Sequence, residues 1–282
     1  MQTIICMKWG TRYGSEYVNR LWTAIGRQTN RPTRLVCFTD DRTGIDKAVQ
    51  CEEIPDINLP PDLINLPWRK LVMWKYPLAD LEGDVLFLDL DLVVTNNLDA
   101  MFDYEPGRFC VIENWTQMGQ KIGNTSAFRF PVGKYTHIFD RLQEDPASVL
   151  DKYRIEQLYI SREIEDMVFW PAEWCVSFKH NLMPRWPLNF FKAPKLPPET
   201  RIVAFTGKPD QDEAARGEWP VRRWYKKTYK HVRPTKWIED HWVEDSGGED
   251  SGVEDSGVED SGVEDSGVED SGVEDSGVEE KG

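Results

Sequence analysis

Two aspartates, Asp89 and Asp91, lie two positions apart at the end of an apolar run in the segment GDVLFLDLDLVVTNNLD. In an extended chain, residues i and i+2 point to the same side, so both carboxylates would face one way. Such a pair repels unless one acid is protonated or a cation lies between them. Oxygen ligands favour Mg²⁺ or Mn²⁺, which often also bind substrate phosphates. The pair therefore predicts a metal site that can hold a diphosphate.

Two other interpretations of the pair remain open. Acids at the end of a strand also occur in solvated turns, and an Asp-x-Asp pair alone is common. The segment FLDLDLVV also fits the Asp-x-Asp-x-Val sequence of haloacid-dehalogenase phosphatases, in which the first aspartate is a nucleophile. Those enzymes carry the motif on their first strand, whereas a β-α-β pattern comes before it here.

The residues before the pair predict an α/β fold. Residues 3–8 and 33–41 are apolar, strand-like runs, and the apolar positions of 14–28 recur at helical spacing with Ser15 as a candidate N-cap. This β-α-β order favours a parallel sheet. The run 85–88 is apolar on both faces, which is typical of a central strand covered by helices. Ligands of such sheets bind beyond the carboxyl ends of the strands, where Asp89 and Asp91 lie.

The rest of the chain predicts alternating elements. Residues 43–67 contain four prolines and indicate a long irregular connection. Apolar patterns predict single strands over 84–94, 108–114, 124–130, 167–171 and 200–207, and helices over 68–77, 134–145 and 151–164. Residues 218–232 are basic and aromatic and indicate a closing helix or loop.

Charge divides the chain into two parts. Residues 1–242 carry 33 acidic and 33 basic side chains, whereas 243–282 form eight pentads of the VEDSG type with 16 acids and one lysine. A period of five matches neither a helix nor a strand, and one valine per pentad buries too little surface to offset chain entropy. We predict a folded domain over 1–242 and a disordered acidic tail over 243–282. The tail is either a repeat expansion without function or a solubilising or partner-docking arm.

Composition also limits the partners and the compartment. The chain has no run of 18 apolar residues, so no transmembrane segment is expected, and its first residues indicate a strand rather than a signal peptide. Five scattered cysteines without a Cys-x-x-Cys motif are typical of reduced thiols in the cytoplasm. The neutral domain shows no basic stripe that indicates nucleic acid. Residues 222–231 could make peripheral contact with an anionic membrane or a lipid-linked acceptor, although a solvated face is the simpler interpretation.

Seven segments together resemble one known family. The segment VLFLDLDLVVTNNLDAMF resembles the Asp-x-Asp segment of glycosyltransferases with the GT-A fold, and is most similar to glycosyltransferase family eight. Six further segments resemble that family in the same order, and together the seven cover nearly all of 1–210: TIICMKWGTRYGSEYVNRLWTAI, RLVCFTDD, LPWRKLVMWKYPL, GNTSAFRF, RIEQLYIS and RIVAFTGKPDQ.

The resemblance implies a fold and an activity. The fold would be α/β of the GT-A, Rossmann-like type, in a single domain with a mostly parallel central sheet. The activity would be metal-dependent transfer of a hexose from a nucleotide-sugar donor to a saccharide or glycolipid acceptor, with retention of configuration and with Mn²⁺ or Mg²⁺ as cofactor. Bacterial surface polysaccharide biosynthesis is the process implied. The alternatives are a catalytically weakened nucleotide-sugar-binding protein of this fold and the phosphatase described above.

The resemblance also implies roles for individual residues. Asp91 would be the main metal ligand, and Asp89 would contact the ribose or a metal-bound water. The other implied donor-site residues are Tyr13 against the base, with Asp40 or Asp41 nearby; Lys70 and Arg69 at the diphosphate or sugar; Asn124 and Ser126 at the sugar; and Gly207 and Lys208 at the phosphates. The implied catalytic residues are Asp91, Gln157 near the anomeric carbon, and Glu156, which stands where the family has the aspartate of an Asp-Gln pair.

The sequence departs from the family at the metal site. Relatives usually supply a histidine just before the Gly-Lys loop, where this chain has Ala204 and Thr206. The third ligand would then be a water, Thr206, or His180. This departure motivates the alternative of a weakened enzyme.

Overall fold

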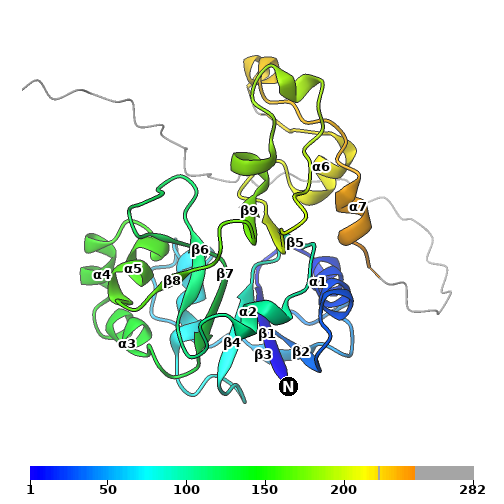
Figure 1. The fold of residues 1–282 in the computed structure, drawn as a ribbon. Coiled ribbons are helices and arrows are strands. Elements are labelled where there is room, and N and C mark those ends of the chain that lie inside the picture. Colours follow the sequence, from blue (N-terminus) through cyan, green and yellow to red (C-terminus); the bar gives the residue numbers. More distant parts are fainter. Residues whose placement is uncertain (222, 245–282) are drawn as a thin grey trace, which may run out of the picture. The chain divides into compact units, whose positions relative to one another are not determined.

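The computed structural model describes residues 1–221 and 223–244, and Figure 1 shows its fold. The chain divides into two units, 1–245 and 246–282, and all described residues belong to the first unit. The predicted disordered tail lies outside the described residues except for Val243 and Glu244.

A seven-stranded sheet forms the centre of the fold. Its order is β3-β2-β1-β4-β7-β6-β8, and four of its six strand pairs are parallel. The strands are β1 (Gln2–Lys8), β2 (Thr33–Thr39), β3 (Gln50–Glu53), β4 (Asp84–Leu88), β6 (Cys110–Glu113), β7 (Gly123–Pro131) and β8 (Val168–Phe169). This arrangement confirms the prediction of an α/β fold with a mostly parallel central sheet.

Helices cover both faces of the sheet, which explains the continuous apolar runs of its central strands. In β1, Ile5 and Met7 face a core formed with η1 (Pro67–Trp74), α3 (His137–Glu144) and α5 (Glu156–Glu163). Ile4 and Cys6 face a second core formed with α1 (Ser15–Gln28). The remaining helices are α2 (Asp99–Asp103), α4 (Pro146–Lys152), η2 (Phe178–Leu182), η3 (Leu188–Phe190), α6 (Gln211–Arg216), η4 (Trp224–Thr228) and α7 (Trp237–His241).

The predicted single strand over 84–94 is wrong. The chain leaves the large sheet after β4, and β5 (Leu92–Val94) joins a second sheet of order β5-β10-β9, with β10 (Ile202–Ala204) and β9 (Cys175–Ser177). The Asp89 N–H donates to Ser126 O on β7 (2.8 Å), whereas Asp91 O accepts from the N–H of Phe205, just after β10 (2.8 Å). Asp89 and Asp91 therefore lie at the junction between the two sheets.

Several predicted boundaries also change. Gly14, not Ser15, is the N-cap of α1, and no side chain caps that end. The predicted helix over 68–77 is the 3₁₀ helix η1, and the one over 151–164 is interrupted by extended backbone at Ile155 between α4 and α5. The connection over 43–67 contains the edge strand β3, whose sequence QCEE lacks an apolar pattern.

All five cysteines are free thiols, as predicted. Cys6 and Cys37 lie opposite each other on the paired strands β1 and β2 without forming a disulfide. Among the described helices, none combines the length and the apolar character needed to cross a membrane.

Candidate functional site

The candidate site lies at one edge of the seven-stranded sheet, where several chain segments converge. The parallel strands β1, β2 and β4 end there, as parallel strands must end at a common edge. Because β7 is antiparallel to β4, with Leu88 opposite Ala127, its first residues reach the same edge. Strand β6 runs antiparallel to β7, so its last residue, Glu113, also ends there. The sheet topology thus gathers residues far apart in the sequence.

A buried ion pair between Lys70 and Asp89 forms the centre of the site. The Lys70 Nζ donates to Asp89 Oδ2 (2.6 Å), and the two side chains are only 11% and 16% exposed. Burial alone would lower the pKa of Lys70, but Asp89 and Glu156 outweigh it and raise that pKa. Burial raises the pKa of Asp89 despite the lysine. Lys70 therefore stays charged and is the cation of the cluster.

Asp91 is the second acid of the pair. Burial, and then the charge of Asp89, raise the pKa of Asp91 to about 7, while Lys70 and Arg12 oppose this shift. Burial and the neighbouring acid therefore disfavour the charged form of Asp91 more than Lys70 and Arg12 favour it.

A third acid, Glu156 at the start of α5, interacts electrostatically with Lys70. Its side chain is 5% exposed, and its Oε1 accepts from the Thr125 hydroxyl (3.3 Å). Burial raises its pKa, and Lys70 opposes that effect. The carboxylate of Glu156 thus contributes to the charge around Lys70 from a position without free access to solvent.

Asn124 and Ser126 reach the same edge on β7. Both side chains are buried, and Asn124 Oδ1 accepts from the Ser126 N–H (3.1 Å). This hydrogen bond fixes the side chain of Asn124 to Ser126, the residue whose carbonyl pairs with Asp89.

The orientation of the Gln157 side-chain amide follows from a chain of donors. The Thr116 N–H donates to Asn114 Oδ1 (3.0 Å), and a backbone N–H can only donate, so this atom must be the oxygen. Asn114 Nδ2 then donates to Gln157 Oε1 (3.2 Å). The Gln157 oxygen is thereby occupied, and its NH₂ group remains as a donor.

The loop after β1 closes another side of the site. Burial, followed by the charge of Asp91, raises the pKa of Tyr13, and Arg12 lies 5.2 Å from the Tyr13 ring. Tyr13 contacts Tyr17 (ring centroids 4.8 Å apart), which contacts Trp242 (5.2 Å). Aromatic contacts thus connect the site to the end of the folded domain.

The loop after β10 lies against Asp91 through the Phe205 N–H. Gly207 has a left-handed φ of +72°, and Lys208 Nζ pairs with Asp210 (2.7 Å) and Glu213 (2.5 Å). The Gln211 side chain donates to Leu90 O (3.1 Å), which fixes this loop to the Asp-x-Asp segment. Lys208 is therefore next to the site but already paired with acids.

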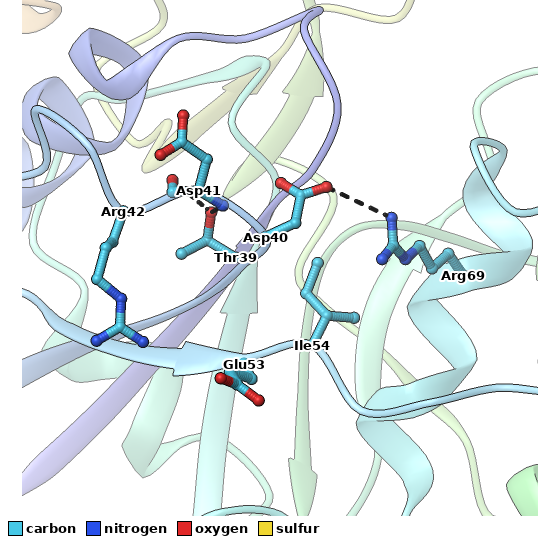
Figure 2. Close-up of a pocket in the computed structure, with 7 residues that line it drawn as sticks. All are labelled: Thr39, Asp40, Asp41, Arg42, Glu53, Ile54 and Arg69. Carbon is cyan, nitrogen blue, oxygen red and sulfur yellow. Dashed lines mark hydrogen bonds and ion pairs between the residues drawn. The ribbon is translucent and has the colours of Figure 1, made fainter.

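Asp40, Asp41 and Arg69 line a pocket of about 390 Å³ (Figure 2). Asp40 accepts from the Gly10 N–H (3.1 Å) and lies 3.8 Å from Arg69, whereas the Asp41 carboxylate accepts from the Thr43 N–H (2.9 Å). Thr39, Arg42, Glu53 and Ile54 complete the lining. Asp89 and Asp91 do not line this pocket, although Arg69 is adjacent to Lys70 in the chain.

The residues present are compatible with a divalent cation. Asp89 and Asp91 offer oxygen ligands, and burial followed by the charge of Asp89 raises the pKa of Asp91, a shift that a bound cation would oppose. In the part of the chain that the structure describes, no group of three His, Cys, Asp or Glu side chains is placed to hold a metal. His180 therefore does not complete a triad with the two aspartates. Mg²⁺ and Mn²⁺ are commonly held by one or two carboxylates plus waters and substrate phosphates.

Comparison with known proteins identifies the fold. No family model matches the sequence, and no curated protein matches it. The galactosyltransferase LgtC, in complex with donor and acceptor sugar analogues, is similar with a TM-score of 0.52, 15% identity, and coverage of 74% of this chain and 89% of LgtC. An active-site mutant of LgtC matches with a TM-score of 0.52, 13% identity, and coverage of 80% and 93%. GlyE from Streptococcus pneumoniae TIGR4 has a TM-score of 0.50, 12% identity, and coverage of 84% and 66%. The chain has the GT-A fold of these glycosyltransferases.

The structure groups most of the residues expected from the sequence. Lys70, Asp89, Asp91 and Glu156 form one buried cluster, whereas Asp41 is exposed and engaged in a local turn. The sequence analysis missed four residues at the site: Arg12, Asn114, Thr125 and Asp210. Three of them are ordinary polar residues that only their partners in space reveal, while Arg12 precedes Tyr13 and could have been noticed as a cation in that loop.

Proposed function

We propose that this chain is a metal-dependent glycosyltransferase that moves a hexose from a nucleotide-sugar donor to a saccharide or glycolipid acceptor, with retention of configuration. The supporting observation is the cluster of Lys70, Asp89, Asp91 and Glu156 at the carboxyl edge of a GT-A sheet, where α/β folds bind their ligands. Cytoplasmic polysaccharide biosynthesis is the setting that we propose for this reaction.

The charges of the cluster suit the departure of a nucleoside diphosphate. Negative charge grows on the leaving phosphate as the bond to the sugar breaks, and a fixed cation there lowers the barrier. Lys70 supplies such a cation, because its neighbours Asp89 and Glu156 keep it protonated and fixed. Mn²⁺ or Mg²⁺ held by Asp89 and Asp91 would add Lewis-acid stabilisation of the same charge.

The remaining side chains would bind and orient the donor. We assign Tyr13 and Asp40 to the nucleoside side, with Arg69 between the pocket and Lys70. Asn124, Ser126 and the free NH₂ group of Gln157 would face the sugar. Gly207 and Lys208 would contact the phosphates, with Lys208 exchanging its bonds to Asp210 and Glu213 for a phosphate. The buried Glu156 would hold Lys70 in place and would not itself react with the sugar. This role suits a retaining route in which the leaving phosphate accepts the proton of the acceptor hydroxyl.

A second candidate is a catalytically weakened protein that binds nucleotide sugars. It is favoured by the lack of a third metal-ligating side chain in the described residues and by the pairing of Lys208 with acids. The phosphatase alternative loses its basis, because the Asp-x-Asp segment follows β4 of a GT-A fold rather than the first strand.

One assay separates the two candidates. The full chain is incubated with a panel of nucleotide sugars, including UDP- and GDP-linked hexoses, with and without Mn²⁺, and released nucleoside diphosphate is measured. Metal-dependent release from one donor supports the transferase. Calorimetric binding of a donor without any release supports the weakened protein, and the absence of both would reject the proposed function.

Asp91→Ala tests the metal assignment. We expect donor cleavage to fall by about a hundredfold or more and Mn²⁺ to lose its effect, since the main ligand is missing. The melting temperature should not fall, because a buried acid with a raised pKa is itself unfavourable. Asp103→Ala, at an exposed pair with Arg31, is the control and should behave like the unsubstituted protein. Unchanged Mn²⁺-dependent turnover in Asp91→Ala would exclude Asp91 as a ligand.

A further inference from the structure

Residues 1–242 have no net charge, but their basic and acidic residues are unevenly distributed along the chain. Segments 178–198 and 219–238 contain eleven basic residues and no acidic residue. The other residues of 1–242 contain 22 bases and 33 acids. The segment between the two, 199–218, contains five acids, so the basic character does not form a continuous stripe in the sequence.

Folding brings the two basic segments together. Trp186 Nε1 donates to Thr228 O (3.2 Å), and the buried Asn189 donates through Nδ2 to Tyr229 O (2.8 Å) and His231 O (2.9 Å). The rings of Phe190 and His231 stack with centroids 4.7 Å apart. In Figure 1 these segments run beside each other in the part of the chain that carries α6 and α7. Their exposed side chains form what we call the basic-aromatic surface.

Large apolar side chains are exposed on this surface. Of the eleven exposed large hydrophobic residues in the described chain, six belong to it: Trp186, Leu188, Phe191, Trp224, Tyr225 and Tyr229. Phe191 and Trp224 are 78% and 80% exposed. Exposed apolar residues gathered in one place, rather than scattered singly, mark an interaction site.

Exposed lysines lie among these aromatic side chains. Lys192 is adjacent to Phe191, Lys195 follows three residues later, and Lys227 lies on the same short helix as Trp224. Within the described residues none of the three lysines forms an ion pair, and neither segment supplies an acid that could neutralise them. The surface therefore offers apolar side chains and positive charge together.

We propose that the basic-aromatic surface binds the headgroup layer of a bilayer that contains anionic phospholipid. Lysines attract an anionic leaflet with about 1 kcal/mol each near the surface. Trp and Tyr prefer the boundary between headgroups and acyl chains, and Phe and Leu can bury their side chains at that depth. Leu188 and Phe191 carry no polar group that a nucleic acid or a soluble polyanion would recognise, which favours the bilayer. This inference is independent of sugar transfer.

Vesicle sedimentation with the full chain tests the inference. The probes are phosphatidylcholine vesicles with and without phosphatidylglycerol, at about 0.1 M salt, where the Debye length is about 10 Å. We expect the protein to bind the phosphatidylglycerol vesicles at least tenfold more tightly than the neutral ones. Lys192→Gln, Lys195→Gln and Lys227→Gln combined should remove most of that preference. The assay is then repeated at high salt. The double variant Phe191→Ser and Trp224→Ser should bind vesicles more weakly than the unsubstituted protein at about 0.1 M salt and at high salt.

Matched substitutions on the other part of the domain provide the control. Lys47, Arg154 and Tyr76 are exposed and lie outside both basic segments. Lys47→Gln, Arg154→Gln and Tyr76→Ser combined should leave vesicle binding within twofold of the unsubstituted protein. All positions changed are exposed, so melting temperatures should stay equal and report that each variant is folded.

Three results would overturn the inference. The first is equal binding to both vesicle types, and the second is a loss of binding in the control variant as large as in the lysine variant. The third is no vesicle binding together with lysine-dependent binding of a single-stranded oligonucleotide or heparin, which would assign the surface to a soluble polyanion instead.

Discussion

At the scale of single residues, the candidate site is a set of buried charges around one lysine. Asp89, Asp91 and Glu156 all have raised pKa values, and Lys70 is the cation that all three share as a partner. Removing one partner of a buried ion pair leaves the other charges uncompensated, which costs far more than the pair contributes. Lys70 should therefore matter both for stability and for chemistry.

Lys70→Met tests this role. We expect the free energy of unfolding to fall by about 3 kcal/mol, because three buried acids lose their nearest cation. Turnover should fall by about a hundredfold, as for other fixed groups that stabilise developing charge. Urea unfolding and donor cleavage measure the two effects.

Arg69→Met is the matched control for the stability effect alone, since Arg69 is the preceding residue in the chain and lies 3.8 Å from the partly exposed Asp40. A surface pair of this kind is worth about 0–1 kcal/mol. Equal destabilisation of the two variants would contradict the role of Lys70 as the cation that stabilises the buried acids.

Asn114→Asp tests the orientation of Gln157. The aspartate can still accept from the Thr116 N–H but cannot donate, so the Gln157 amide must turn and present its oxygen to the site. We expect kcat to fall at least tenfold with little change in the melting temperature. In a Gln157→Ala background the same substitution should cost nothing more, because the NH₂ group is already gone.

Asn58 and Gln143 form a second Asn–Gln contact that can serve as the control for this test, because neither residue belongs to the candidate site. Asn58 donates through Nδ2 to the backbone oxygen of Gln143, and its own N–H donates to the Gln143 side chain. Asn58→Asp should therefore leave kcat unchanged. Additive losses for Asn114→Asp and Gln157→Ala would show that Asn114 has a purely structural role.

At the scale of elements, the irregular pairing of β6 with β7 shapes the edge that carries the site. The register shifts between Val111 and Ile112, so that Ile112 lies opposite Asn124. Gly123 makes this possible: a Cβ there would lie 2.8 Å from a methyl group of Val111, which as a β-branched residue cannot easily rotate away.

Gly123→Ala should destabilise the domain by about 1–3 kcal/mol, as overpacking in a filled core does. It should also weaken donor binding, because Asn124 is the next residue. Gly26→Ala in α1 is the comparison, since its Cβ would meet no atom within 4 Å. That variant should be neutral or up to about 1 kcal/mol more stable, as alanine favours a helix over glycine. Calorimetric melting of both variants measures the difference.

Most elements of the large sheet could be predicted from the sequence, because strands buried on both faces are apolar throughout. β1, β2, β4 and β6 contain such runs, whereas β7 is apolar mainly in its second half, at Ala127, Phe128 and Phe130. The polar strand β3 and the three-residue strand β9 carry too little pattern to be noticed. The junction at 89–91 was missed because apolar and acidic residues alternate through it without a break, although the two halves pair with different sheets.

The same limit applies to the site. Asp89 and Lys70 could be expected from motifs, because each lies in a segment with a recognisable family pattern. Asn114 could not, because its role depends on Gln157, which is 43 residues away and is reached only through the fold. Family resemblance also implied a phosphate-binding role for Lys208 without revealing that Lys208 forms ion pairs with Asp210 and Glu213.

At the scale of the whole molecule, the candidate site residues and their supports all lie before residue 245. Removing 246–282 deletes 14 acids and one lysine and keeps the bond between Glu244 and Asn19. We expect unchanged kcat and KM in nucleotide-sugar cleavage. A truncation after Lys236 should instead lose activity and stability, because it also removes the fully buried Ile238 and the Trp242 contact with Tyr17. A large loss on removing 246–282 alone would show that the repeat acts in catalysis.

The aromatic contacts from Tyr13 through Tyr17 to Trp242 have a consequence for biosynthesis. The ribosome synthesises Tyr13 more than two hundred residues before Trp242. The nascent polypeptide can assemble β1, β2 and β4 early, yet the tyrosine beside Asp91 gains its final support only when translation has passed Trp242. Assembly of this side of the candidate site would therefore be among the later events in the folding of residues 1–244.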